Sequence, residues 1–126
     1  MSPESVDYLG TAARILQEAE VLLEEGHNEV ASREAYLAAL NTARAIVFEL
    51  TGDAPKTYSG ARTLISKLVH EGLALDAEYV RFLGTGVDQK TDADYGPRTP
   101  LSDEAAQASL ATAKRFLAAA KLVLKR

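Results

Sequence analysis

Apolar residues recur at steps of three and four along most of the chain, and this spacing constrains the fold more than any other feature. Residues at such steps share one face of an α-helix, whereas the strict alternation of a half-buried strand is absent. We therefore predict an all-α fold. The first of these apolar stripes consists of Val6, Leu9, Ala12, Leu16, Ala19 and Leu23.

Capping residues and glycines divide the pattern into separate helices. Ser2 followed by Pro3 predicts the start of the first helix, and Gly26 predicts its end. Asn28 is expected to cap a second helix that runs to about residue 50 and ends before Gly52. The apolar stripe predicted for this second helix consists of Val30, Leu37, Leu40, Val47 and Leu50.

Three further helices are predicted in the rest of the chain. Thr57 or Ser59 caps a shorter helix that closes near Gly72, and Asp76 opens a fourth helix. The segment from 84 to 100 is the longest predicted loop, and the last helix starts at Ser102. Together these elements predict a single domain over residues 1–126, built as an up-and-down bundle of four to five helices.

Composition limits the function classes. With 126 residues, 47% hydrophobic and 25% charged, the chain matches one ordinary globular domain. No apolar run reaches membrane-spanning length, and the acidic, polar N-terminus lacks the order of a signal peptide, so we expect a cytoplasmic protein with no membrane contact. The absence of cysteine and the presence of two histidines argue against a metal site, and we expect no cofactor.

The charge is unevenly distributed along the sequence. A net charge of −4 argues against a surface that is basic throughout and coats nucleic acid. Residues 1–50 hold nine acidic and three basic side chains, whereas residues 102–126 hold two acidic and five basic ones. A local basic face on the last helix is compatible with this distribution.

Two segments carry candidate binding residues. In "PKTYSG", Lys56 and Tyr58 precede or begin a helix whose free N–H groups favour anions, so a phosphate or the edge of a nucleotide could dock there. In "KTDADYG", residues 90–96, Asp94 and Tyr95 stand side by side, and Asp94 could accept hydrogen bonds. The simpler interpretation is that both segments only cap and buttress the fold. The predicted donors to Asp94 are Lys56, Arg33 and Arg44.

Three short motifs in this order resemble the HEPN domains of prokaryotes, specifically the small stand-alone type. They are "AYLAALNTARA" at 35–45, "KTYSG" at 56–60 and "ADYG" at 93–96. The resemblance implies a dimeric helical bundle that is often encoded beside a minimal nucleotidyltransferase, as a toxin-antitoxin or defence module. It also implies that active members are metal-independent ribonucleases, which use an arginine and, four to six residues later, a histidine, brought together across the dimer.

The chain departs from this motif at the residues that would carry catalysis. Aligned on Arg44, the arginine position of the family falls on Glu34 and the histidine position on Asn41, although Arg33 lies one residue away. The loop histidine is replaced by Tyr58. An amide can keep hydrogen bonds in an inward-facing slot but cannot exchange a proton near pH 7, and an unperturbed tyrosine titrates near ~10.

Three functional hypotheses follow. The first is a HEPN-like homodimer that acts as a binding or regulatory module for a nucleotide, an RNA or a partner protein such as a minimal nucleotidyltransferase. The second is a metal-independent ribonuclease that uses Arg33 or Arg44 with Tyr58 and Asp94. The third is a protein whose helices simply dimerise. The predicted binding groove of the first hypothesis is lined by Tyr36, Asn41, Lys56, Tyr58, Lys90, Asp94 and Tyr95.

Overall fold

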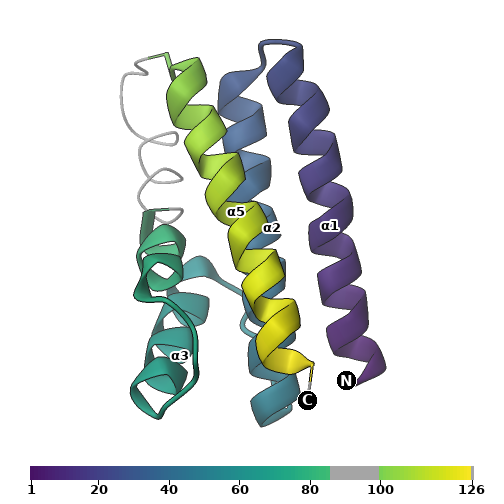
Figure 1. Cartoon of the computed structure of the whole chain (residues 1–126), viewed down its shortest axis with the longest axis vertical. Helices are drawn as coiled ribbons and strands as arrows, with labels where there is room; N and C mark the ends of the chain where they lie inside the picture. Colours follow the sequence, from purple (N-terminus) through teal and green to yellow (C-terminus); the bar gives the residue numbers. More distant parts are fainter. Residues whose placement is uncertain (86–99, 126) are drawn as a thin grey trace.

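The computed structural model describes residues 1–85 and 100–125 as an all-α bundle (Figure 1), which confirms the predicted fold class. Its helices are α1 (Pro3–Glu24), α2 (Asn28–Thr51), α3 (Tyr58–His70) and α5 (Asp103–Leu124), with a further helical segment at 77–85. Helices α1, α2 and α5 run side by side, α3 lies beside them, and the two chain ends lie at the same end of the bundle. Within the described residues, no helix has the length and apolar character needed to cross a membrane.

The predicted caps at three helix starts are confirmed. Ser2 Oγ accepts a hydrogen bond from the backbone N–H of Ser5 at 3.2 Å, and Ser102 Oγ caps α5 in the same way. At α3 the cap is Thr57, whose Oγ1 accepts from the N–H of Gly60 at 3.0 Å. These side chains satisfy N–H groups that have no partner within their own helix.

The prediction that Asn28 caps α2 was wrong. Asn28 is the first residue of the helix, and the capping position is held by His27, whose side chain makes no capping hydrogen bond. Asn28 Nδ2 instead donates to the carbonyl oxygen of Leu101 at 3.2 Å and to Asp103 Oδ1 at 2.6 Å. The side-chain amide of Asn28 therefore bonds to residues at the start of α5 instead of capping α2. These hydrogen bonds connect the α1–α2 turn to the beginning of α5.

Parts of the predicted apolar stripes were also wrong. Val6 is 53% exposed, Val30 37% and Leu50 49%. On α1 the position that faces α2 is Ser5, which is fully buried and donates from Oγ to the carbonyl oxygen of Ala45 at 3.2 Å. A hydrogen bond of this kind offsets the cost of burying a hydroxyl group. Serine can therefore be buried here, at a position that the spacing of apolar residues does not identify.

Helix α2 is the central element of the bundle, in contact with α1, α3 and α5. Small side chains on several of its sides let the neighbouring helices approach closely. Its alanines at positions 35, 38, 39, 43 and 45 are all fully buried, as is Ile46. A hydrogen bond of 3.2 Å between Ser32 Oγ and Ser109 Oγ joins α2 to α5 inside the core.

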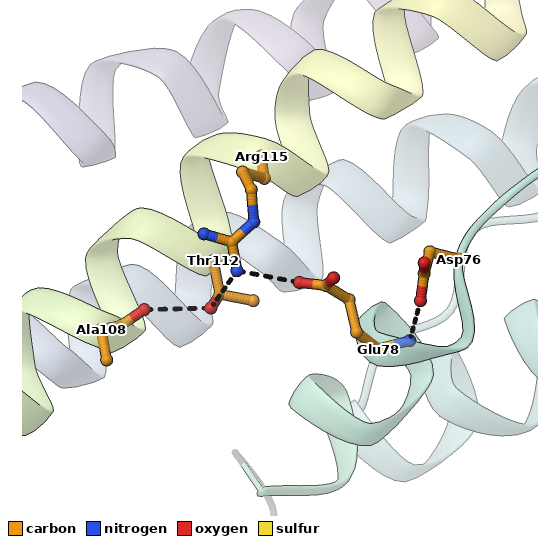
Figure 2. Close-up of polar contacts among 5 residues, drawn as sticks. All are labelled: Asp76, Glu78, Ala108, Thr112 and Arg115. Carbon is orange, nitrogen blue, oxygen red and sulfur yellow. Dashed lines mark hydrogen bonds and ion pairs between the residues drawn. The ribbon is translucent and has the colours of Figure 1, made fainter.

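The helical segment 77–85 is fixed to the bundle by aromatic stacking and by one ion pair. Tyr79 stacks on Phe116 of α5 with ring centroids 4.8 Å apart. Arg115 Nη2 donates to Glu78 Oε1 at 2.9 Å, and Asp76 Oδ1 accepts from the N–H of Glu78 at 2.8 Å (Figure 2). The segment therefore begins where Asp76 predicts and lies against α5.

Two glycine substitutions should change stability in opposite directions. Gly52 has a φ of 87° at the end of α2, so alanine there is strained, and we expect Gly52→Ala to lower the free energy of unfolding by about 1 kcal/mol. Gly10 lies inside α1 with open space around it, so Gly10→Ala should raise the free energy of unfolding by about 1 kcal/mol. Urea denaturation of both variants measures the two effects. Equal effects of the same sign would contradict these backbone assignments.

Candidate functional site

One side of α2 is left incompletely covered by the other helices, and it carries the residues at the catalytic positions of the motif. Glu34, Leu37, Asn41 and Arg44 recur at steps of three and four, so they share one face of the helix. We call these four residues the polar stripe. Glu34, Leu37 and Arg44 are half-buried, and Asn41, in the middle of the stripe, is only 6% exposed.

The two polar residues inside the apolar part of α2 are satisfied by their own helix. Asn41 Nδ2 donates to the carbonyl oxygen of Leu37 at 3.0 Å, and Thr42 Oγ1 donates to that of Ala38 at 2.9 Å. Asn41 Oδ1 accepts no hydrogen bond within the described part of the chain and is not fully buried. The amide is therefore stable where it lies and keeps one acceptor for a ligand.

Arg44 holds the loop that precedes α3. Its Nε donates to the carbonyl oxygen of Pro55 at 2.8 Å, and its Nη2 donates to that of Lys56 at 3.3 Å. The planar guanidinium group suits two neighbouring acceptors, which a lysine could not serve in the same geometry. Arg44 thus positions the exposed Lys56 and the start of α3 beside the polar stripe.

Tyr58, the first residue of α3, is half-buried and packs against the hydrophobic core. Burial raises the pKa of its hydroxyl to about 12; the charge of Glu34 also raises this pKa, and Arg44 opposes the shift. Because both charges act on it, the hydroxyl lies alongside the polar stripe. A phenol with this pKa is almost fully protonated near pH 7, so it can donate a hydrogen bond but is a poor general base.

Two further predicted site residues, Tyr36 and Arg33, lie outside the polar stripe. Tyr36 lies on another side of α2, buried, with its ring stacked on Phe82 at a centroid distance of 4.3 Å. Burial raises the pKa of Tyr36, and a hydrogen bond with Ser109 opposes that shift. Arg33 is exposed beside the polar stripe. The predicted residues Lys90, Asp94 and Tyr95 lie outside the described residues.

Neither histidine lies on the polar stripe. His27 is at the α1–α2 turn and His70 is at the end of α3, and both are exposed. Among residues 1–85 and 100–125, no group of three or more acidic or histidine side chains is placed to hold a metal ion. The arrangement around Asn41 therefore offers hydrogen bonds and charge, and its described residues include no imidazole.

Sequence reasoning missed one residue that the structure brings close to this region. Arg62, one turn after Tyr58, packs its side chain against Gly84 of segment 77–85. A signal was present in the sequence, because residues 54–70 contain basic side chains and no aspartate or glutamate. That run is unusual in a chain whose net charge is −4.

Replacing Tyr58 by phenylalanine should reduce the loss of stability at high pH. Because the pKa of Tyr58 is about 12 in the folded protein and 10.0 in the unfolded chain, its stabilising contribution is complete below pH 10 and disappears as the pH rises to 12. Urea unfolding at pH 9 and pH 11 should therefore show a smaller drop for Tyr58→Phe than for the unmodified protein. Glu34→Gln should have a partial effect of the same sign. Identical drops in all three proteins would contradict the buried position of this hydroxyl.

Comparison with known protein families gives a match over nearly the whole length of the chain. The family model described as HEPN domain matches residues 5–123, which include α2, α3 and all of the polar stripe. A search of curated proteins finds no match. The matched range and the all-α bundle agree, and the chain belongs to the HEPN domain family.

Proposed function

We propose that this HEPN protein is a non-catalytic homodimer that acts as a binding or regulatory module. The observation that carries this proposal is that the polar side chains on and beside the polar stripe can form hydrogen bonds but are poorly suited to proton transfer. Asn41 can bind but cannot exchange a proton near pH 7, Tyr58 has a pKa of about 12, and Arg44 is engaged with two loop carbonyl groups. These residues keep the polarity of a site and lack its acid-base capacity.

The proposed ligand is a nucleotide, an RNA or the surface of a partner protein. Membership of the HEPN family supports a module related to nucleotides or RNA, regulatory or nuclease-like, and HEPN domains commonly dimerise. A minimal nucleotidyltransferase partner and a toxin-antitoxin or defence role belong to the same proposal, and they rest on the resemblance of the three motifs. The binding face in the described part of the chain consists of Asn41, Lys56 and Tyr58.

The alternative function is a metal-independent ribonuclease. Arg33 favours it, because this exposed residue lies next to the position where the family motif has arginine. The half-buried carboxylate of Glu34 weighs against it, since a negative charge at that position repels the phosphate that an arginine would hold. Growth arrest on expression that disappears with Arg44→Ala would support the ribonuclease.

Purified protein mixed with RNA should leave the RNA intact. The expected absence of cleavage follows from Asn41 at the histidine position of the family motif, because an amide cannot exchange a proton near pH 7. Gel electrophoresis of a mixed-sequence RNA over a time course, without added metal, measures it. Sequence-specific cleavage that is abolished by Asn41→Ala or Tyr58→Phe would overturn the non-catalytic proposal.

A matched pair of substitutions should separate binding by Asn41 from its structural role. Asn41→Leu removes the free amide oxygen and keeps the number and branching of the side-chain heavy atoms, whereas Thr42→Val removes a fully buried hydroxyl one residue away. We expect nucleotide or short RNA to raise the melting temperature of the unmodified protein and of Thr42→Val, but not of Asn41→Leu. Light scattering on the same samples should show a dimer. Melting temperatures unaffected by every nucleotide and RNA tested would favour a protein whose helices only dimerise.

A further inference from the structure

The polar stripe is the middle part of a longer row of residues on the incompletely covered side of α2. Val30 precedes Glu34 by four residues, and Phe48 follows Arg44 by four, so an apolar residue extends the stripe at each end. Val30 is 37% exposed, and Phe48 is half-buried beside Tyr8 of α1, with ring centroids 6.5 Å apart. We call the whole row the α2 seam: Val30, Glu34, Leu37, Asn41, Arg44 and Phe48.

The spacing of the α2 seam is that of a helix that packs lengthwise against another helix. Its residues follow one another at alternating steps of four and three, which is a heptad repeat. At 1.5 Å per residue, the seam from Val30 to Phe48 is about 27 Å long. In a heptad contact the side chains at these steps fit between side chains of the partner helix. The incompletely covered side of α2 therefore has the pattern of a helix–helix contact.

The positions of the α2 seam are symmetric about the level of Ala39. They form three pairs whose members lie equally far before and after this level. Two copies of α2 that cross antiparallel there would place the two members of each pair opposite one another. Such a contact has two-fold symmetry, so each pairing occurs twice. The pairs are Val30 with Phe48, Glu34 with Arg44 and Leu37 with Asn41.

The two charges of the α2 seam are not paired with each other or with another ion within one copy. Glu34 is half-buried and makes no ion pair within residues 1–85 and 100–125. Arg44 lies about 15 Å further along the same helix, out of reach of Glu34. Its Nε and Nη2 donate to the loop before α3, and its Nη1 makes no hydrogen bond in the described part of the chain.

The signs of these charges favour one orientation of a second copy. Antiparallel α2 helices bring each Glu34 to an Arg44, whereas parallel helices would bring glutamate to glutamate and arginine to arginine. Antiparallel pairing also brings the exposed Val30 to the half-buried Phe48, so apolar contacts form at both ends of the seam. A second copy of this chain therefore complements the α2 seam along its whole length.

We infer that Glu34 selects the pairing partner of this chain, through an ion pair with the partner's Arg44 across an antiparallel α2 seam. The inference rests on the proposed homodimer and adds its contact face, its register and the residue that discriminates between partners. A copy with arginine at position 34, as in the family motif, would meet Arg44 and be rejected by like charge. The Asn41 amides of both copies lie near the two-fold axis, so the two copies contribute to one shared site.

Reversing the charges at positions 34 and 44 tests this pairing in the full chain. Glu34→Arg should raise the dissociation constant of the dimer about tenfold, because each dimer contains the new repulsion twice. Arg44→Glu should weaken the dimer at least as much. An equimolar mixture of the two variants should recover the affinity lost by each, because every charge then faces its opposite. Sedimentation equilibrium measures the dissociation constants, and circular dichroism melting verifies that each variant is folded.

Glu104→Arg is the matched control for the change of charge. Glu104 is exposed on α5, which packs on the side of α2 that carries Ser32, and this variant should dimerise like the unmodified protein. A second pair of variants leaves the Arg44 contacts with the loop intact. Val30→Gln should weaken the dimer, whereas Leu122→Gln, at a residue of α5 that is 73% exposed, should not.

The outcomes separate this inference from the proposed function. A dimer that Glu34→Arg and Val30→Gln leave unchanged, or that Glu104→Arg weakens equally, would overturn the α2 seam and leave the homodimer standing. An unmodified protein that stays monomeric at every concentration would overturn the homodimer and the seam together. Dimers that respond as expected but cleave RNA would overturn the non-catalytic function and leave the seam standing.

Discussion

The burial of α2 among its neighbours is the constraint on which the rest of the structure depends. Its fully buried alanines let α1 and α5 approach closely, and the aromatic contact of Tyr36 with Phe82 brings segment 77–85 onto another side. One face of α2 then remains for polar residues. The polar stripe lies on this face because the other sides are occupied, and so its position follows from packing rather than from the chemistry of the stripe itself.

The polar residues on this face are bound to backbone groups, and this determines what they can do. The amide of Asn41 is held by the helix, and the guanidinium group of Arg44 is held by the loop before α3. Each contact fixes the orientation of a side chain. Asn41 still keeps its amide oxygen as a hydrogen-bond acceptor. Fixed polar groups bind a ligand at a low cost in side-chain entropy, whereas proton transfer also requires a group with a pKa near the working pH.

The sequence predicted the helices well because their start signals are local. Ser2, Thr57 and Ser102 each accept a hydrogen bond from the N–H group three residues later, so the signal is contained in a short stretch of sequence. The exposed Val6 and Leu50 show the limit of periodicity, because the spacing identifies an apolar stripe but not which neighbour covers it. The contact of Arg62 with Gly84 joins residues far apart in the sequence, so only the folded chain reveals it.

The distribution of charge gives the proposed complex a direction. Glu34 on the polar stripe repels phosphate, whereas the exposed Lys56 just before α3 attracts it, and Tyr58 stands between a carboxylate and a cation that act on its pKa with opposite sign. In the proposed binding function, the charge of Glu34 would therefore keep a phosphate on the Lys56 side of the site, and a base or a sugar would face Asn41. A carboxylate at this position does not prevent binding, because base edges and ribose hydroxyl groups carry hydrogen-bond donors that a carboxylate or an amide oxygen accepts. In the proposed function, the residues that replace the catalytic pair of the family motif would thus leave a site with one side for phosphate and another side that accepts hydrogen bonds.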